Sequence, residues 1–210
     1  MQTKSDKECV AQSTYDHLYQ TQDKQSERAV HHISLPATTD ELLALRAGDE
    51  VLLSGKIFTM RDAGHARALQ YLQENGELPY GLAGQAVFYA GPTEERTDIK
   101  NAPFAAIGPT TASRMDFAAP QLMQAGINVM LGKGQRSQDV KLACEHTSSV
   151  YLVATGGAAA LLATHVIDST TVAWDDLGTE ALRCLTICNL PCFCGFDTYG
   201  GDIYGGDIYD

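Results

Sequence analysis

The stretch Val51–Asn75, VLLSGKIFTMRDAGHARALQYLQEN, joins a predicted strand directly to a predicted helix. Its first part, through Met60, is rich in apolar and β-branched side chains, which are typical of a strand. The second part carries Ala66, Leu69 and Leu72 on one helical face, and Gly76 follows as a residue that ends helices. A strand that passes into a helix in this way indicates an α/β fold.

The same alternation continues on both sides of this stretch. Upstream of it, Thr38-x-x-Glu41 is a capping box, which predicts that a short helix, ELLALR, begins there. Further strands are expected over residues 85–89, 104–107, 127–131 and 150–153. One helix is expected after Thr111, with Met115, Phe117, Leu122 and Met123 as its apolar positions, and another from Ser137 to Ala143. Strands that alternate with helices favour a single α/β domain with a mixed or partly parallel sheet.

The uncharged run Ser149–Ile167, SVYLVATGGAAALLATHVI, is just long enough to span a membrane. Thr155-Gly156-Gly157 interrupts it, so we predict a buried strand, a glycine turn and a buried helix instead. The N-terminal residues are polar and lack the apolar segment of a secretory signal. We therefore expect a cytoplasmic protein with no membrane contact.

The composition is that of an acidic globular protein. The 210 residues include 44% hydrophobic side chains, enough for a core, and the formal net charge is −11. Nucleic acids and anionic membranes require a basic surface, so neither is an expected partner. A small acidic substrate remains compatible with this charge, because a few cations can bind a carboxylate locally.

Four of the six cysteines lie close together as C-x3-C-x3-C-x-C, at positions 184, 188, 192 and 194. This spacing matches neither paired zinc motifs nor ferredoxin motifs. Cys192 and Cys194 alternate with Phe193, as inward-facing residues of a strand do, and buried cysteine packs as a small hydrophobic residue. Core packing is therefore the favoured interpretation, and a cysteine-based metal-binding or redox module is the alternative from a different functional class.

Three loops place a cation or a hydroxyl group beside glycine or a helix start, directly after a predicted strand. They are Arg61–His65 (RDAGH), Gly108–Arg114 (GPTTASR) and Gly132–Gly134 (GKG). Ligands bind at the carboxyl ends of strands in open α/β sheets, and helix N-termini there offer free N–H groups to anions. Together with the charges of Arg61, Arg114 and Lys133, these loops predict a small dicarboxylate ligand.

Each loop also has a purely structural interpretation. Arg61 could pair with Asp62 or with a nearby glutamate, and Thr110 or Thr111 could simply cap a helix. His65 is more often a structural or surface histidine than an acid–base group. The three loops therefore argue for a site only when they are taken together.

Taken in order, the motifs resemble a known family. SGKIFTMRDAGHAR, AGPT, GPTTASRMD, GKGQRSQDV and YLVATGGAAALLA are similar to the β portion of class I, iron–sulfur fumarate hydratases, a family that also includes L-tartrate dehydratase β subunits. The resemblance runs from about Ile33 to about Ile203. The RSQDV sequence and the aspartate of RMD are closer to the fumarases. Asp197–Gly201 departs from the family, which tends to have a His- or Lys-Gly-Asn segment there, and the family does not require the four clustered cysteines.

The resemblance implies a compact β/β/α domain of the swivelling type and the reversible hydration of fumarate to (S)-malate, a reaction of the tricarboxylic acid cycle. By motif match, Arg61, Arg114 and Lys133 would bind substrate carboxylates, and Thr110 would be the catalytic base. The family's [4Fe–4S] cluster is expected on an α subunit. No residue of this chain is expected to ligate a metal.

These expectations divide the chain into a polar N-terminal tail over residues 1–30, a fumarase β-type catalytic domain over residues 31–203, and a C-terminal tail over residues 204–210. GGDIY occurs twice in tandem at that end, and we expect a solvated tail there rather than a calcium loop. The chain is expected to be inactive without its α subunit and to form a higher oligomer with it. An L-tartrate or other 2-hydroxydicarboxylate dehydratase is the alternative enzyme, and a non-catalytic partner subunit is a third possibility.

Overall fold

A computed structural model describes residues 30–93 and 103–205. The expected N-terminal tail, except for Val30, lies outside the described residues, as does most of the C-terminal tail. The strands are β1 (Val30–Leu35), β2 (Glu50–Thr59), β3 (Ala86–Phe88), β4 (Ala90–Pro92), β5 (Ile107–Pro109), β6 (Val129–Gly132), β7 (Val150–Val153), β8 (Val166–Ala173) and β9 (Leu182–Phe196). The α-helices are α2 (Thr39–Ala44), α3 (Asp62–Asn75), α4 (Ala119–Gln124), α5 (Gln138–Thr147) and α6 (Ala159–Thr164). Short 3-10 helices are η2 (Pro79–Gly81), η3 (Ala112–Met115) and η4 (Asp175–Glu180).

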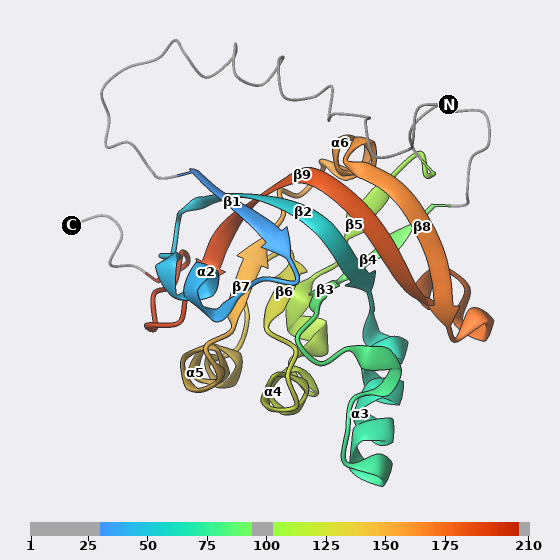
Figure 1. The fold of residues 1–210 in the computed structure, drawn as a ribbon, viewed down its shortest axis with the longest axis horizontal. Coiled ribbons are helices and arrows are strands. Elements are labelled where there is room, and N and C mark those ends of the chain that lie inside the picture. The colour runs from blue at the N-terminus through green and yellow to red at the C-terminus, as the bar shows by residue number, and fades with distance from the viewer. Residues whose placement is uncertain (1–29, 94–102, 206–210) are drawn as a thin grey trace.

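The main sheet has seven strands in the order β1-β2-β3-β6-β7-β9-β8 (Figure 1). Strands β2, β3, β6 and β7 are parallel, whereas β9 runs antiparallel to β7. Strand β9 also pairs with β2 along most of its length, so the strands from β2 to β9 close into a small barrel. The α/β class with a mixed sheet is confirmed, and the closure of the barrel is a feature that the sequence pattern did not predict.

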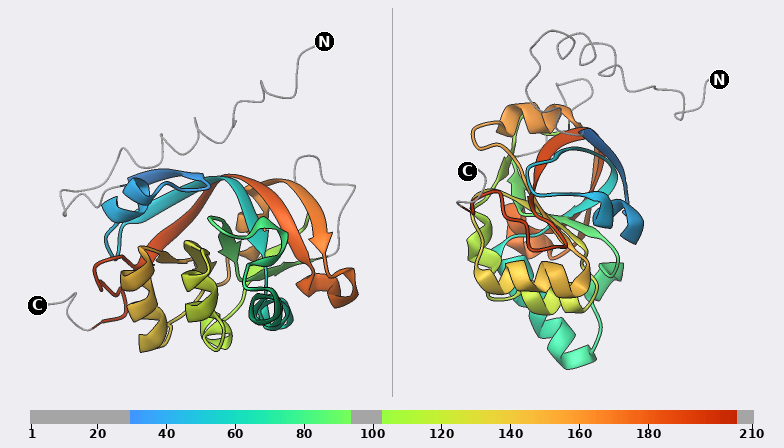
Figure 2. Two further views of the ribbon diagram at one scale, coloured as in Figure 1. Left: turned by 60° about the horizontal axis from the view of Figure 1, so that its bottom comes forward. Right: turned by 90° about the vertical axis from the view of Figure 1, so that its left-hand side faces the viewer.

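Helices α3, α4 and α5 lie side by side on the outer face of the sheet (Figure 2). Helix α3 lies between the parallel strands β2 and β3 in the chain, and α5 lies between β6 and β7. Parallel neighbours need such a crossover, because the chain must return to the same end of the sheet before the next strand begins. Helix α6 packs elsewhere, against β5 and β8.

The core consists of two hydrophobic clusters, one on each face of the central strands. In β3, Phe88 packs in the cluster inside the barrel, whereas Val87 and the following Tyr89 pack in the cluster beneath the helices. Met130 of β6 and Tyr151 of β7 belong to the helix-side cluster in the same way. Both faces of these strands are therefore buried, which explains why their sequences are continuous apolar runs rather than alternating ones.

The predicted signals at helix ends are confirmed with one correction. Thr38 and Glu41 form the complete capping box at the start of α2, and Gly76 ends α3 in the left-handed conformation with φ +75°. The buried face of α3 is formed by Gly64, His65 and Ala68 rather than by Ala66, which is exposed. A rotation of about 100° per residue places position 66 away from that face.

The helix expected after Thr111 is wrong as a continuous element. The chain forms the short turn η3 and then α4, and Phe117, expected on the apolar face, lies between them with 54% of its surface exposed. Pro120 accounts for the break, because proline fits the first turn of a helix but interrupts its interior. This break leaves Arg114 and Asp116 in a compact turn beside the loop after β6.

The strand, glycine turn and helix predicted over residues 149–167 are present as β7, a turn and α6, and β7 is buried as expected. The expectation of a buried helix is wrong, because only Leu162 and Ala163 of α6 are buried and Leu161 is 48% exposed. Within the part of the chain that the structure describes, no helix has both the length and the apolar character needed to cross a membrane. Cys192 and Cys194 lie in β9 with their side chains in the barrel core, as the alternation with Phe193 predicted.

The expectation of a solvated tail is wrong for the first copy of the C-terminal repeat, Gly200–Tyr204, which is folded onto the domain. It forms an antiparallel bridge with the end of β9. The buried carboxylate of Asp197 accepts hydrogen bonds from the backbone N–H groups of Ala47, Tyr199 and Gly201. This carboxylate therefore fastens the C-terminal segment to the loop before β2, in the segment where the sequence departs from the family.

Candidate functional site

The three predicted loops meet at one end of the barrel, and two of them are joined through their backbones. The N–H of Thr110 donates to the carbonyl of Tyr89 at 2.7 Å. The N–H of Lys133 donates to the carbonyl of Thr110 at 3.3 Å, and the N–H of Ala112 donates to the carbonyl of Lys133 at 2.9 Å. These bonds place the loop after β5 directly beside the loop after β6, as two residues of a short parallel bridge.

The loop after β2 joins this group through its charges. Asp62 Oδ1 lies 2.8 Å from Arg114 Nε in an ion pair, and Asp62 Oδ2 lies 4.0 Å from Arg61 Nη2. Arg61 Nη2 lies 3.3 Å from Glu180 Oε1. The other oxygen of Glu180 accepts the N–H of Ala63, in the first turn of α3. The predicted pairing of Arg61 with neighbouring carboxylates is therefore confirmed, and the carboxylate of Asp62 links the two predicted arginines.

Thr110 lies within this group rather than at a helix cap. Its Oγ1 accepts a hydrogen bond from Arg114 Nη1 across 3.5 Å. Turn η3 has no side-chain cap bond at its start, so the interpretation of Thr110 or Thr111 as a helix cap is wrong. The Thr110 hydroxyl and a guanidinium group are thus neighbours, and that contact joins two of the four predicted site residues.

Lys133 differs from the two arginines in its charge environment. The structure gives it no ion pair with any of the described residues, whereas Arg61 and Arg114 each face a carboxylate. Its side chain is partly exposed. Within the group, Lys133 is therefore the cation whose charge is available to a ligand.

His65 is buried next to the group and contacts the backbone of Arg61. It is 1% exposed, its Nδ1 lies 2.9 Å from the carbonyl oxygen of Arg61, and its ring contacts the Tyr89 ring edge-on at 4.8 Å. Burial lowers the pKa of His65 to about 3, against the opposing effect of its bond to Arg61. The ring is therefore neutral near pH 7, so Nδ1 carries the proton and donates it to the carbonyl group. His65 is a structural residue that holds the backbone of Arg61.

A buried ion pair lies beneath the Lys133 loop. Arg136 Nε donates to Asp116 Oδ1, and the other oxygen of Asp116 accepts the N–H of Ser137 at 2.7 Å. The Arg136 guanidinium also packs over the rings of Tyr89 and Tyr151, at 5.1 and 5.0 Å from their centroids. This arginine belongs to the RSQDV motif and this aspartate to the RMD motif, and nothing in the spacing of the two motifs indicates that they pair.

Glu180 is a second residue of the group that sequence reasoning missed. It lies at the end of η4, more than a hundred residues after Arg61 in the chain. It reaches the site because η4 packs against both α3 and β4. No local motif marks this glutamate, so only the tertiary contacts could identify it.

The described residues do not provide a ligand set for a metal centre. No group of three or more His, Cys, Asp or Glu side chains within residues 30–93 and 103–205 is arranged to hold a metal ion. The thiols of Cys192 and Cys194 lie in the barrel core, where burial raises their pKa well above the usual range. Metal ligation requires the thiolate, so these two cysteines act as core residues.

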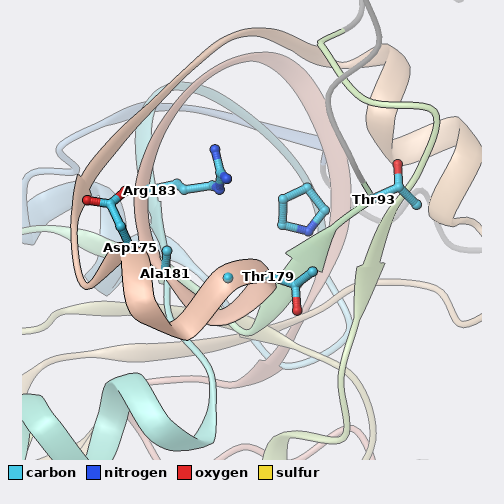
Figure 3. Close-up of a pocket in the computed structure, with 7 residues that line it drawn as sticks. Thr93, Asp175, Thr179, Ala181 and Arg183 are labelled. Carbon is cyan, nitrogen blue, oxygen red and sulfur yellow. The ribbon is translucent and has the colours of Figure 1, made fainter.

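A pocket of about 290 Å³ opens between η4 and β4. Figure 3 shows Asp175, Thr179 and Ala181 on one side of it and Thr93 on the other, with the Arg183 side chain extending between them. None of the four predicted site residues lines it. The pocket is a neighbour of the site, however, because the space around the α-carbon of Gly91 is bounded by both Arg61 and the carbonyl of Thr179.

Comparison with known proteins identifies the family of the chain. The family model described as Fumarase C-terminus matches residues 6–206. The chain is 35% identical over 168 residues to Fumarate hydratase 1, mitochondrial, of Leishmania major, a match that covers 79% of this chain and 30% of that protein. It is 30% identical over 173 residues to the L(+)-tartrate dehydratase subunit beta of Escherichia coli K12, covering 80% of this chain and 83% of that subunit.

A third relative is the aerobic class I fumarate hydratase of Escherichia coli K12, which is 38% identical over 151 residues, or 70% of this chain and 27% of that enzyme. The chain thus spans less than a third of either fumarate hydratase but most of the tartrate dehydratase subunit. Because the family model covers nearly the whole chain, including all three loops that meet at the site, the chain belongs to the Fumarase C-terminus family.

Proposed function

We propose that this chain is the β subunit of a hydro-lyase that reversibly hydrates fumarate to (S)-malate at a site shared with an α subunit. The observation that carries the proposal is the convergence of Arg61, Thr110, Arg114 and Lys133 from three separate loops onto one end of the barrel. A group with three cations and one hydroxyl suits a substrate that has two carboxylates and exchanges one proton.

Substrate binding is assigned to the three cations. A guanidinium has five N–H donors, so Arg61 and Arg114 retain donors beyond those directed at Asp62 and Glu180. Two fixed arginines linked by one carboxylate provide two anion sites at a set spacing, as a dicarboxylate requires. Lys133 adds the charge that no described carboxylate neutralises.

The proton step is assigned to Thr110. In the dehydration direction a proton leaves the carbon beside one carboxylate, and negative charge builds on that carboxylate. Fixed cations such as Arg114 and Lys133 stabilise this charge in the transition state. An ordinary threonine hydroxyl holds its proton too tightly to act as a base, but a guanidinium beside Oγ1 favours the alkoxide form.

The loss of hydroxide is assigned to a group on the α subunit. A [4Fe–4S] cluster supplies a Lewis acid for this purpose when it is bound. The described residues of this chain do not fit the ligand set of a cluster, and we therefore place its ligands on the α subunit. It follows that the β chain alone is expected to be inactive.

L-tartrate dehydratase is the second candidate, because the chain covers 83% of the β subunit of that enzyme from Escherichia coli. The same set of cations would bind tartrate, which also has two carboxylates and loses a hydroxyl group. The RSQDV sequence and the RMD aspartate favour fumarate as the first choice.

The test is to co-express this chain with its α subunit, purify the complex without oxygen, and measure turnover of fumarate and of L-tartrate. We expect fumarate hydration, and we expect Lys133→Ala or Arg114→Ala to lower kcat/KM by about 100-fold without changing the circular dichroism spectrum. Lys141→Ala is the matched control, since Lys141 lies in α5 and its ion pair is with Asp202, at 4.0 Å, rather than with a residue of the proposed site. Turnover of L-tartrate alone would replace the substrate, and wild-type kinetics in Lys133→Ala would contradict the assigned site.

A further inference from the structure

We infer that Arg136, held by Asp116, is a positioning residue that fixes the distance between Arg114 and Lys133 in the active site. The inference rests on the proposed function for its catalytic consequence. Neither residue is among the four that we assign to substrate, and neither faces the ligand directly, because the Arg136 side chain is fully buried.

The pair connects the two loops that carry the site residues. Asp116 follows Arg114 by two positions at the end of η3, and Arg136 follows Lys133 by three positions before α5. The bond from Arg136 Nε to Asp116 Oδ1 therefore joins the loops through side chains, and the N–H of Ser137 donates to the second oxygen of the same carboxylate. Both oxygens of Asp116 are thus directed at the segment that follows the lysine.

The two tyrosines that pack on the guanidinium extend this connection. Arg136 Nη1 lies 3.4 Å from the hydroxyl of Tyr89, and the backbone carbonyl of Tyr89 accepts the N–H of Thr110. The hydroxyl of Tyr151 donates to the carbonyl of Gly134, the residue after the lysine, at 2.7 Å. The same buried guanidinium therefore contacts one tyrosine whose backbone carbonyl bonds the proposed base and one tyrosine whose hydroxyl bonds the lysine loop.

Fold stability does not account for this arrangement. Arg136 Nη2 is buried and has no hydrogen-bond partner among the described residues, which is unfavourable for a charged group. A buried ion pair can commonly be replaced by apolar side chains of similar volume without loss of stability. What apolar replacements could not supply is the directed bond between two loops, and this is the role that we assign to the pair.

Displacement of either loop should reduce turnover. Misplacing a reacting or binding group by about 1 Å costs about 100-fold in rate. Without the ion pair of Arg136 with Asp116, the Arg114 and Lys133 loops would remain joined by their backbone hydrogen bonds. They would, however, sample a wider range of distances from each other. The expected signature is therefore a lower kcat together with faster opening of those bonds, while the rest of the barrel is unchanged.

The experiment compares Arg136→Met, Arg136→Lys and Asp116→Asn in the complex with the α subunit. Arg136→Met removes the charge at similar volume, and Arg136→Lys keeps the charge but loses the fork of donors. Hydrogen exchange reports the opening at the N–H groups of Ala112 and Lys133, which bridge the two loops. Ile33→Ala is the matched control, because it weakens the core at β1, on the half of β2 remote from the site.

We expect Arg136→Met and Asp116→Asn to lower kcat about 100-fold and to raise exchange at Ala112 and Lys133 at least tenfold, with partial recovery in Arg136→Lys. Ile33→Ala should lower the melting temperature and leave kcat near the wild-type value. Unchanged exchange in both folded variants would overturn the inference, as would faster exchange with wild-type kcat. If the wild-type complex turns over neither acid, the proposed function fails, and exchange at these two N–H groups still decides whether the pair braces the loops.

Discussion

Lowering the pH should lower the free energy of unfolding through His65, and the pKa of its buried ring sets the size of the effect. The ring is buried and neutral in the folded protein, with its pKa lowered to about 3 mainly by desolvation. In the unfolded chain the pKa of His65 returns to about 6.5. Between pH 6.5 and pH 3 the ring is therefore protonated in the unfolded state but not in the folded state. Stability attributable to His65 is therefore fully present above pH 6.5 and is lost progressively as the pH falls toward 3.

The size of the effect follows from the two pKa values. Each pH unit inside that window changes the free energy of unfolding by about 1.4 kcal/mol, and the loss between pH 6 and pH 4 is about 2.5 kcal/mol. Urea unfolding at a series of pH values measures it. His65→Gln removes the titrating ring and keeps a donor for the Arg61 carbonyl. Between pH 6 and pH 4, the free energy of unfolding of this variant should therefore fall by about 2.5 kcal/mol less than that of wild type.

The control for this measurement is His146→Gln, which removes an exposed histidine from the last turn of α5. It should retain the wild-type pH dependence. Equal slopes for wild type and His65→Gln between pH 6 and pH 4 would refute the reasoning, since the buried ring would then not be the group that takes up the proton on unfolding.

Further predictions concern packing and the core. Gly132→Ala should cost about 1–3 kcal/mol in urea unfolding, because a Cβ there would lie 2.9 Å from a side chain of η3, whereas Gly156→Ala, which faces open space, should change stability by less than about 0.5 kcal/mol. Cys192→Ala and Cys194→Ala should each lower the free energy of unfolding by about 1–3 kcal/mol, because each removes a buried side chain. The iron content of the assembled enzyme should be unchanged, and a loss of iron would favour the alternative of a cysteine-based metal module. Asp197→Ala should cost about 3 kcal/mol or more, because three backbone N–H groups lose a charged acceptor, and a melting temperature equal to that of wild type would contradict this role.

Under the proposed function, the pairing of carboxylates with cations would allow an acidic protein to bind an acidic substrate. Asp62 and Glu180 lie against Arg61 and fix its direction. They also offset part of its charge, so the site does not require a basic surface around it. The overall charge of −11 therefore excludes nucleic acid as an expected partner without excluding a dicarboxylate.

Sequence reasoning succeeded wherever the controlling interaction is local. The capping box at Thr38, the stop at Gly76 and the inward alternation of Cys192 with Cys194 depend on residues within a few positions of one another. It failed after Thr111, where a proline in the first turn of α4 outweighs the apolar spacing and exposes Phe117.

The sequence by itself determined the α/β class, the positions of β2, β3, β6 and β7 and of most helices, and the three loops that carry the predicted site residues. The strand expected over residues 104–107 lies instead at Ile107–Pro109, and the sequence pattern did not predict β1, β4, β8 or the full length of β9. Strand and helix periodicity, caps and motif order are properties of short segments, and they can be read without knowing what packs against them. That the loops belong together was indicated by the order of the motifs and their resemblance to one family. A shared edge of parallel strands does not explain it, because the loop with Thr110 follows β5, which pairs antiparallel with β4 outside the main sheet.

Only the tertiary structure decided which residues hold those loops in place. The closure of the barrel requires β9 to pair with β2 across more than a hundred residues, and the same approach brings Glu180 to Arg61. The pair of Arg136 with Asp116 depends on the break before α4 and on the packing of two tyrosines. Ion pairs of this kind have no sequence period, because a cation can pair with any carboxylate that the fold brings near it. Only the packing of distant segments decides which carboxylate becomes the partner.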